Sequence, residues 1–86
     1  MQKKKLVVLG GGESGVGAAI LGITKGFETL VSDLGAILPE YKKDLEEHSI
    51  PYEENQHTSE LILSADLVVK SPGIPDSAPI VQSLVK

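Results

Sequence analysis

The sequence predicts an α/β fold: an open parallel sheet of about four strands in three layers, with the chain ending before a fifth strand. Two observations favour this class. Continuous apolar runs such as residues 6–9 and 67–69 lack the alternation of a half-exposed strand, which is typical of parallel strands covered on both faces. Segments with helical spacing of apolar residues separate these runs, and such alternation favours right-handed connections between parallel strands.

The individual elements follow from local signals. Gly26 ends the first predicted helix, because glycine is common just past a helix end. Pro39 suits the first turn of the second helix, and Pro51 favours an edge position for the third strand. Thr58 or Ser59 is expected to cap the third helix. The predicted strands are residues 5–9, 29–33, 49–53 and 66–70, and the predicted helices are residues 15–25, 39–48, 60–64 and 78–86.

Composition excludes several classes of protein. Eighty-six residues allow one small domain, and no apolar run approaches the roughly 20 residues that cross a bilayer. We therefore expect a cytoplasmic protein with no membrane partner. Eight lysines, no arginine and twelve acids give a net charge of −4, which argues against a nucleic-acid partner. The absence of cysteine removes disulfides and thiolate chemistry, and two histidines are too few for a zinc site without carboxylate help.

A glycine-rich loop is the main functional signal. Residues 10–15, Gly-Gly-Gly-Glu-Ser-Gly, fit the pattern G-x-G-x-x-G between a predicted strand and a predicted helix. In that context the glycines allow a tight turn, and the N–H groups that begin the helix face an anion. Asp33 lies 18 residues beyond Gly15, where Rossmann-like folds place the acid that holds ribose hydroxyls. The pattern favours a nucleotide or diphosphate site over glycines that serve close packing alone.

The pattern leaves the nucleotide open. NAD(H) is the default expectation from the fingerprint, whereas NADP is disfavoured because no arginine is available to hold a 2′-phosphate. The sequence lacks the G-x-x-x-x-G-K-[ST] loop that binds ATP, and no nucleophile stands beside a base. We therefore expect these residues to bind a ligand and not to catalyse a reaction.

Two further loops follow strands and should lie at the same edge of the sheet. Residues 71–75, Ser-Pro-Gly-Ile-Pro, follow the fourth predicted strand, and Asn55-Gln56-His57 precedes the third helix. We interpret His57 as a surface or capping residue in preference to a catalytic base, because spacing assigns it no partner. The acids are interpreted as a solvated face and not as a metal site; they are Glu40, Asp44, Glu46, Glu47, Glu53 and Glu54.

Three segments together resemble a known family. Residues 8–19 with the glycine loop, residues 31–33 ending in Asp33, and residues 65–75 with the Ser-Pro-Gly-Ile-Pro loop resemble the amino-terminal domain of the Mur ligases, over essentially all 86 residues. The resemblance implies that residues 1–86 are one UDP-substrate-binding domain of a bacterial, cytoplasmic, ATP-dependent ligase. That ligase adds D-glutamate to UDP-N-acetylmuramoyl-L-alanine in peptidoglycan biosynthesis, with ATP and Mg²⁺ held by domains outside these residues.

The resemblance also implies which residues meet the substrate. The glycine loop would hold the diphosphate, and the residues after the second strand would hold the uracil and ribose. Some relatives have Thr-Arg where Leu34-Gly35 stand here, so the resemblance implies only backbone contacts there. No catalytic residue and no metal ligand are implied. The implied UDP-binding residues are Gly12, Glu13, Ser14, Gly15, Asp33, Leu34, Asn55, Ser71 and Gly73.

Overall fold

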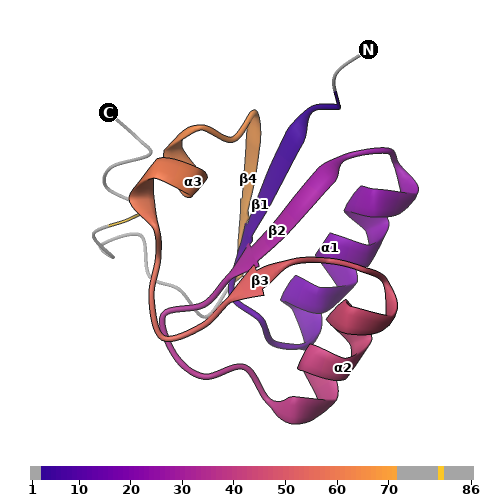
Figure 1. The fold of residues 1–86 in the computed structure, drawn as a ribbon. Helices are drawn as coiled ribbons and strands as arrows, with labels where there is room; N and C mark the ends of the chain where they lie inside the picture. Colours follow the sequence, from indigo (N-terminus) through magenta and orange to yellow (C-terminus); the bar gives the residue numbers. More distant parts are fainter. Residues whose placement is uncertain (1–2, 72–79, 81–86) are drawn as a thin grey trace.

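The computed structural model describes residues 3–71 and Ile80. In these residues four parallel strands form one sheet in the order β3-β2-β1-β4, with helices between successive strands (Figure 1). The predicted α/β fold with an open parallel sheet is therefore confirmed. The elements are β1 (Lys5–Leu9), α1 (Glu13–Thr24), β2 (Glu28–Ser32), α2 (Pro39–Glu47), β3 (Tyr52–Glu53), α3 (Ser59–Leu63) and β4 (Leu67–Lys70).

β1 is an inner strand of the described sheet, between β2 and β4. Its residues Leu6 to Leu9 are at most 4% exposed, as the continuous apolar run predicts. Leu9 pairs with Ser32 of β2 and with Lys70 of β4. Because the strands are parallel, their carboxyl ends meet at one edge, and the loops that follow them lie together there.

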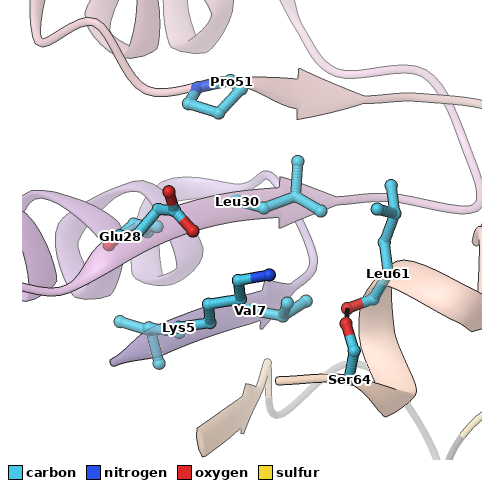
Figure 2. Close-up of a pocket in the computed structure, with 9 residues that line it drawn as sticks. Lys5, Val7, Glu28, Leu30, Pro51, Leu61 and Ser64 are labelled. Atoms are coloured by element: carbon cyan, nitrogen blue, oxygen red, sulfur yellow. Dashed lines mark hydrogen bonds between the residues drawn. The ribbon is translucent and has the colours of Figure 1, made fainter. Parts of the chain in front are cut away.

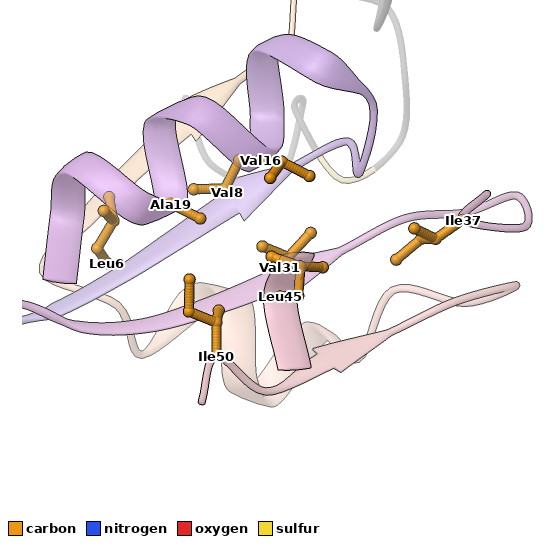
Figure 3. Close-up of a cluster of buried hydrophobic side chains, with 8 residues drawn as sticks. All are labelled: Leu6, Val8, Val16, Ala19, Val31, Ile37, Leu45 and Ile50. Carbon is orange, nitrogen blue, oxygen red and sulfur yellow. The ribbon is translucent and has the colours of Figure 1, made fainter. Parts of the chain in front are cut away.

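Helices α1 and α2 cover one face of the sheet and enclose the larger core. Figure 3 shows side chains of β1 and β2 facing those of the two helices. Leu45 of α2 and Val31 of β2 are fully buried there. This cluster comprises Leu6, Val8, Val16, Ala19, Val31, Ile37, Leu45 and Ile50.

The opposite face carries a smaller cluster of buried hydrophobic side chains. Val7 and Leu9 of β1 pack there with Ile62 of α3 and with Ile80. Helices thus lie on both faces of the sheet, which confirms the predicted three layers. Among the described residues, the helix on this face is α3, which is five residues long. No helix in the described part of the chain is both long and apolar enough to cross a membrane.

Two boundaries near the glycine loop differ from those predicted. α1 begins at Glu13 and not at Gly15, because Gly12 takes the extended N-cap conformation with φ −84° and ψ −167°. β2 ends at Ser32, so Asp33 lies in the loop after the strand and not within it. Glu13 and Ser14 therefore belong to the first turn of α1, and Asp33 belongs to the loop after β2.

The segment predicted as the third strand is divided between a helix cap and a two-residue strand. Ser49 has a positive φ of 57°, Ser49 N–H donates to Glu46, and Ile50 N–H donates to Leu45 at 2.8 Å. This is a Schellman motif, in which the residue after the cap is usually glycine. Buried Ile50 then packs beside Leu45, and only Tyr52 and Glu53 pair with β2. The helix ends within one residue of its predicted end at His48, whereas the predicted strand over residues 49–53 is wrong for Ser49 and Ile50, because these two residues close the helix.

The last elements follow the prediction closely. α3 and β4 begin within a residue of the predicted starts. Thr58 stands at the N-cap position of α3, but the predicted side-chain cap is wrong, because its hydroxyl donates to Glu53 and not to the helix. Unlike the predicted buried strand, β4 leaves Leu67 47% and Val69 37% exposed. Helix α1 lies over β1 and β2, whereas β4 is the last strand of the described sheet on the side of β1. The helix predicted over residues 78–86 falls outside the described residues except for Ile80.

Candidate functional site

The glycine loop is held by backbone contacts at the end of β1. Gly10 has a positive φ of 106°, a conformation that favours glycine, and its N–H donates to the carbonyl of Ser32 at 2.8 Å. A Cβ on Gly15 would lie 1.8 Å from the Gly10 carbonyl oxygen. The first turn of α1 therefore packs directly against the loop, and position 15 has no room for a side chain.

The N-terminus of α1 presents backbone N–H groups at this edge that precede the helical hydrogen bonds. The first helical hydrogen bond runs from Val16 N–H to the Gly12 carbonyl, so the N–H groups of Glu13, Ser14 and Gly15 precede the helical ladder. Gly12, Glu13 and Ser14 are exposed, and nothing lies within 4 Å of a Cβ built on Gly12. Such a helix end attracts anions through its N–H groups and dipole.

Asp33 connects the second strand to the glycine loop. Its Oδ2 accepts a hydrogen bond from Gly11 N–H at 2.7 Å, and its Oδ1 accepts one from Gly35 N–H at 2.9 Å. The carboxylate thus caps its own turn and also holds the glycine loop. Each carboxylate oxygen can accept a second hydrogen bond, so these two contacts leave acceptor capacity for a ligand.

Most of the other predicted site residues lie at the same edge. Leu34 is 66% exposed beside Asp33. Asn55, with a positive φ of 61°, donates its N–H to the Gly35 carbonyl at 2.9 Å. Ser71 N–H donates to the carbonyl of Leu9, the last residue of β1, at 2.9 Å. Gly73 lies outside the described residues. The roles of these residues as ligand contacts stay predictions.

A polar cluster that the sequence analysis missed joins β2, β3 and the start of α3. Ser32 is fully buried, and its Oγ lies 2.7 Å from Glu53 Oε2 and 2.7 Å from His57 Nδ1. Glu53 also accepts hydrogen bonds from Thr58, at 2.8 Å from N–H and 2.6 Å from the hydroxyl. The one available signal was a serine inside a buried strand, which needs a polar partner.

Three of the acids assigned to a solvated face have structural partners instead: Glu46, which accepts the Tyr52 hydroxyl at 2.7 Å, Glu53 and Glu54. Burial would raise the pKa of Glu53, but hydrogen bonds from Thr58 and Ser32 outweigh it and hold that pKa below its usual value. Glu54 pairs with Lys42 at 2.7 Å and accepts Ile37 N–H at 2.9 Å; the Lys42 contact, then the Ile37 bond, lower the Glu54 pKa. The carboxylates of Glu53 and Glu54 fasten the loops around the site. Among the residues that the structure describes, no group of three ligands suits a metal ion.

A pocket lies on the α3 face near the amino ends of β1 and β2, away from the glycine loop (Figure 2). Its volume is about 260 Å³, and apolar side chains such as Leu30 and Leu61 line it. Lys5 and Glu28, which are register partners, supply its charged groups. Because it lies toward the opposite ends of the strands, this pocket is separate from the predicted nucleotide site.

Comparison with known proteins identifies relatives over nearly the whole chain. A family model described as the MurD N-terminal domain matches residues 5–79. The UDP-N-acetylmuramoylalanine–D-glutamate ligase of Bacteroides thetaiotaomicron is 58% identical over 81 residues, which cover 94% of this chain and 18% of that enzyme. The ligase of the same name from Porphyromonas gingivalis is 55% identical over 83 residues, covering 96% of this chain and 18% of the enzyme.

A third relative gives the same result. The UDP-N-acetylmuramoylalanine–D-glutamate ligase of Cytophaga hutchinsonii is 51% identical over 79 residues, covering 92% of this chain and 18% of the enzyme. The chain therefore spans less than a fifth of the length of the curated relatives it matches. These relatives give no support to the alternative of an NAD(H)-binding dehydrogenase domain.

Proposed function

This chain belongs to the family of MurD N-terminal domains, and on that premise we propose that it binds the UDP portion of UDP-N-acetylmuramoyl-L-alanine. The substrate would be presented to a ligase that attaches D-glutamate during peptidoglycan biosynthesis in the bacterial cytoplasm. Residues 1–86 would act as one binding domain of that ligase. The observation that carries the proposal is the open N-terminus of α1, set beside Asp33 at the carboxyl edge of the sheet.

The diphosphate is proposed to lie on the glycine loop. The exposed N–H groups at the start of α1 donate to anionic oxygens without requiring a cationic side chain, which suits a site with no arginine. Glu13 contributes its backbone only, because its exposed carboxylate would repel a phosphate. Ser14 adds a hydroxyl in the same turn, and Gly15 allows the close approach of helix and loop.

The uridine is proposed to lie beside the turn that follows β2. Asp33 retains acceptor capacity for a uracil N–H or a ribose hydroxyl, and Leu34 offers an exposed apolar surface next to it. Asn55 is fixed to this turn through Gly35, and Ser71 stands at the end of β1. We assign Gly73 to the same rim from its place in the sequence.

Catalysis is proposed to depend on parts of the ligase outside these residues. The 86-residue sequence has no P-loop, so ATP, Mg²⁺ and D-glutamate would be held elsewhere in the enzyme. This chain would contribute affinity for the UDP-linked substrate and orient it toward those groups.

The test is a titration of the ¹⁵N-labelled chain, followed by the amide resonances of Gly11 to Gly15. We expect UDP to shift them with a dissociation constant of about 1 mM, which is about −4 kcal/mol. UMP, which lacks the β-phosphate, should bind more weakly. NADH at the same concentrations is the control and should leave these resonances unchanged.

Two results would contradict the proposal. Shifts with NADH alone would favour the dehydrogenase domain. Shifts with UDP confined to residues outside the loop and the Asp33 turn would place the ligand elsewhere. The variant D33A sharpens the test, because losing a charge-assisted acceptor should weaken UDP binding by about one to two decades. It should also lower stability, since the carboxylate holds Gly11 and Gly35.

A further inference from the structure

The hydrogen bonds around Ser32 fix the tautomer of His57. The Ser32 hydroxyl has one hydrogen but lies near three groups: Glu53 Oε2 at 2.7 Å, the Gln56 carbonyl at 3.3 Å and His57 Nδ1 at 2.7 Å. A carboxylate and a carbonyl can only accept. The hydroxyl therefore donates to Glu53, the shorter contact to an acceptor-only group, and His57 must donate its Nδ1–H to the Ser32 oxygen.

The alternative tautomer, with hydrogen on Nε2, would place two oxygen lone pairs against each other. If Ser32 donated to Nδ1, a lone pair of its oxygen would face the Glu53 carboxylate at 2.7 Å with no hydrogen between them. Thr58 stabilises the ionised form of Glu53 through two further hydrogen bonds. The neutral imidazole is thus held with hydrogen on Nδ1, and Nε2 carries the lone pair.

The Nε2 atom of His57 is open for another contact. It forms no hydrogen bond with the described residues, and none of their side-chain nitrogens or oxygens is buried without a partner. Nε2 therefore reaches solvent, although Nδ1 is bonded to the fully buried Ser32.

The Nε2 acceptor of His57 follows a segment that is bonded to the proposed uridine site. The preceding residues are fastened to the turn after β2, through Gln56 N–H to the Asp33 carbonyl at 3.2 Å and Asn55 N–H to the Gly35 carbonyl at 2.9 Å. We propose that His57 is a further ligand-contacting residue of the UDP site, whose Nε2 accepts a hydrogen bond from a uridine hydroxyl or imide N–H. The inference rests on the proposed function and adds a specificity-determining residue to it.

A matched pair of variants separates ligand contact from structural support. In H57N the side-chain amide can occupy the place of Nδ1 and donate to Ser32, but no atom replaces Nε2. In H57Q the amide reaches the place of Nε2 and gives up the contact with Ser32. We expect H57N to keep the wild-type melting temperature and to bind UDP about three- to tenfold more weakly, as for one lost hydrogen bond. H57Q should melt earlier and bind UDP more tightly than H57N does.

NMR of the wild-type chain gives a second test that does not depend on the variants. At pH 8, where an ordinary histidine is neutral, long-range ¹H–¹⁵N correlations should show Nε2 as the unprotonated nitrogen. Its resonance should move on saturation with UDP. If H57N fails to fold, this shift decides the question.

Each other outcome overturns the inference. Nε2–H in the free chain, an Nε2 resonance unmoved by bound UDP, or H57N binding UDP as the wild type does would each remove His57 from the site while leaving the proposed function intact. Absence of UDP binding by the wild type would overturn the proposed function and the inference with it. The tautomer, measured without ligand, would still report whether the cluster is built as described.

Discussion

The two faces of the sheet are built differently. On the α1 and α2 face, eight buried hydrophobic side chains form one cluster, shown in Figure 3. On the α3 face, the cluster among the described residues has four members, and near the carboxyl edge a polar group of Ser32, Glu53 and His57 extends it. Among the described residues, the first face therefore buries more apolar side chains, while the second also holds polar groups beside the proposed ligand site.

Adjacent residues of β2 show the difference most directly. Val31 and Ser32 are both fully buried, yet successive side chains of a strand point to opposite faces. Val31 packs in the apolar cluster, whereas Ser32 hydrogen-bonds to Glu53. Burial alone therefore does not distinguish a packing position from a polar one; the face of the strand does.

The largest predicted effect concerns the junction of the glycine loop with the apolar face. A Cβ on Gly15 would lie 1.8 Å from a backbone oxygen that cannot move aside without breaking the loop. We expect G15A to lower the free energy of unfolding by at least about 3 kcal/mol, from a wild-type value of about 5–10 kcal/mol. Urea unfolding measures both values.

The matched control lies one half-turn along the same helix. Gly17 is exposed, and nothing lies within 4 Å of a Cβ built there. G17A should raise stability by about 0.5–1 kcal/mol, because alanine is the better helix former. If both variants behaved alike, the close packing of α1 on the loop would be wrong.

A second prediction compares the two faces by cavity formation. Leu45 and Ile62 are both 0% exposed, one in each cluster. L45A should lower the free energy of unfolding by about 3–4 kcal/mol and I62A by about 2–3 kcal/mol. The I62A effect is smaller because the short helix α3, beside the open pocket, can relax into the space left by the side chain. Urea midpoints with equal slopes give the two values. An equal or reversed order would show that the α3 face is packed as rigidly as the other.

The smallest predicted effect concerns Glu53, in the polar cluster on the α3 face. Hydrogen bonds lower the Glu53 pKa from its ordinary 4.5, so ionised Glu53 stabilises the folded state above that pH. The stabilisation is lost as pH falls through the lowered folded-state pKa. We expect E53Q to be about 1–2 kcal/mol less stable at pH 7, with the difference narrowing below pH 4.5.

Melting temperatures of both proteins from pH 7 to pH 3 give the measurement. The exposed α2 residue Glu47 provides a control, since E47Q should track the wild type throughout. A gap between wild type and E53Q that stayed constant with pH would mean that the carboxylate charge does not stabilise the cluster.

Local signals predicted the elements well and their partners poorly. Continuous apolar residues placed β1 at residues 5–9 as observed, and the Gly10–Gly15 motif lies at the start of α1. The strand predicted over residues 49–53 shows the limit of such signals, because Ser49 adopts the positive φ that a glycine usually supplies after a helix, and only Tyr52 and Glu53 form the strand. Asp33 was singled out by its spacing from Gly15, but its hydrogen bond to Gly11 required the structure.

By itself the sequence determined the alternation of strands and helices and the glycine loop, since these depend on residues close together in the chain, and it determined the family, since that rests on the order of residue types along the chain. Only the tertiary structure decided the strand order β3-β2-β1-β4 and the polar cluster. Ser32 lies 21 residues from Glu53 and 25 from His57. Whether such residues meet depends on which strands pair and in which register, and register is set by the packing of the whole sheet.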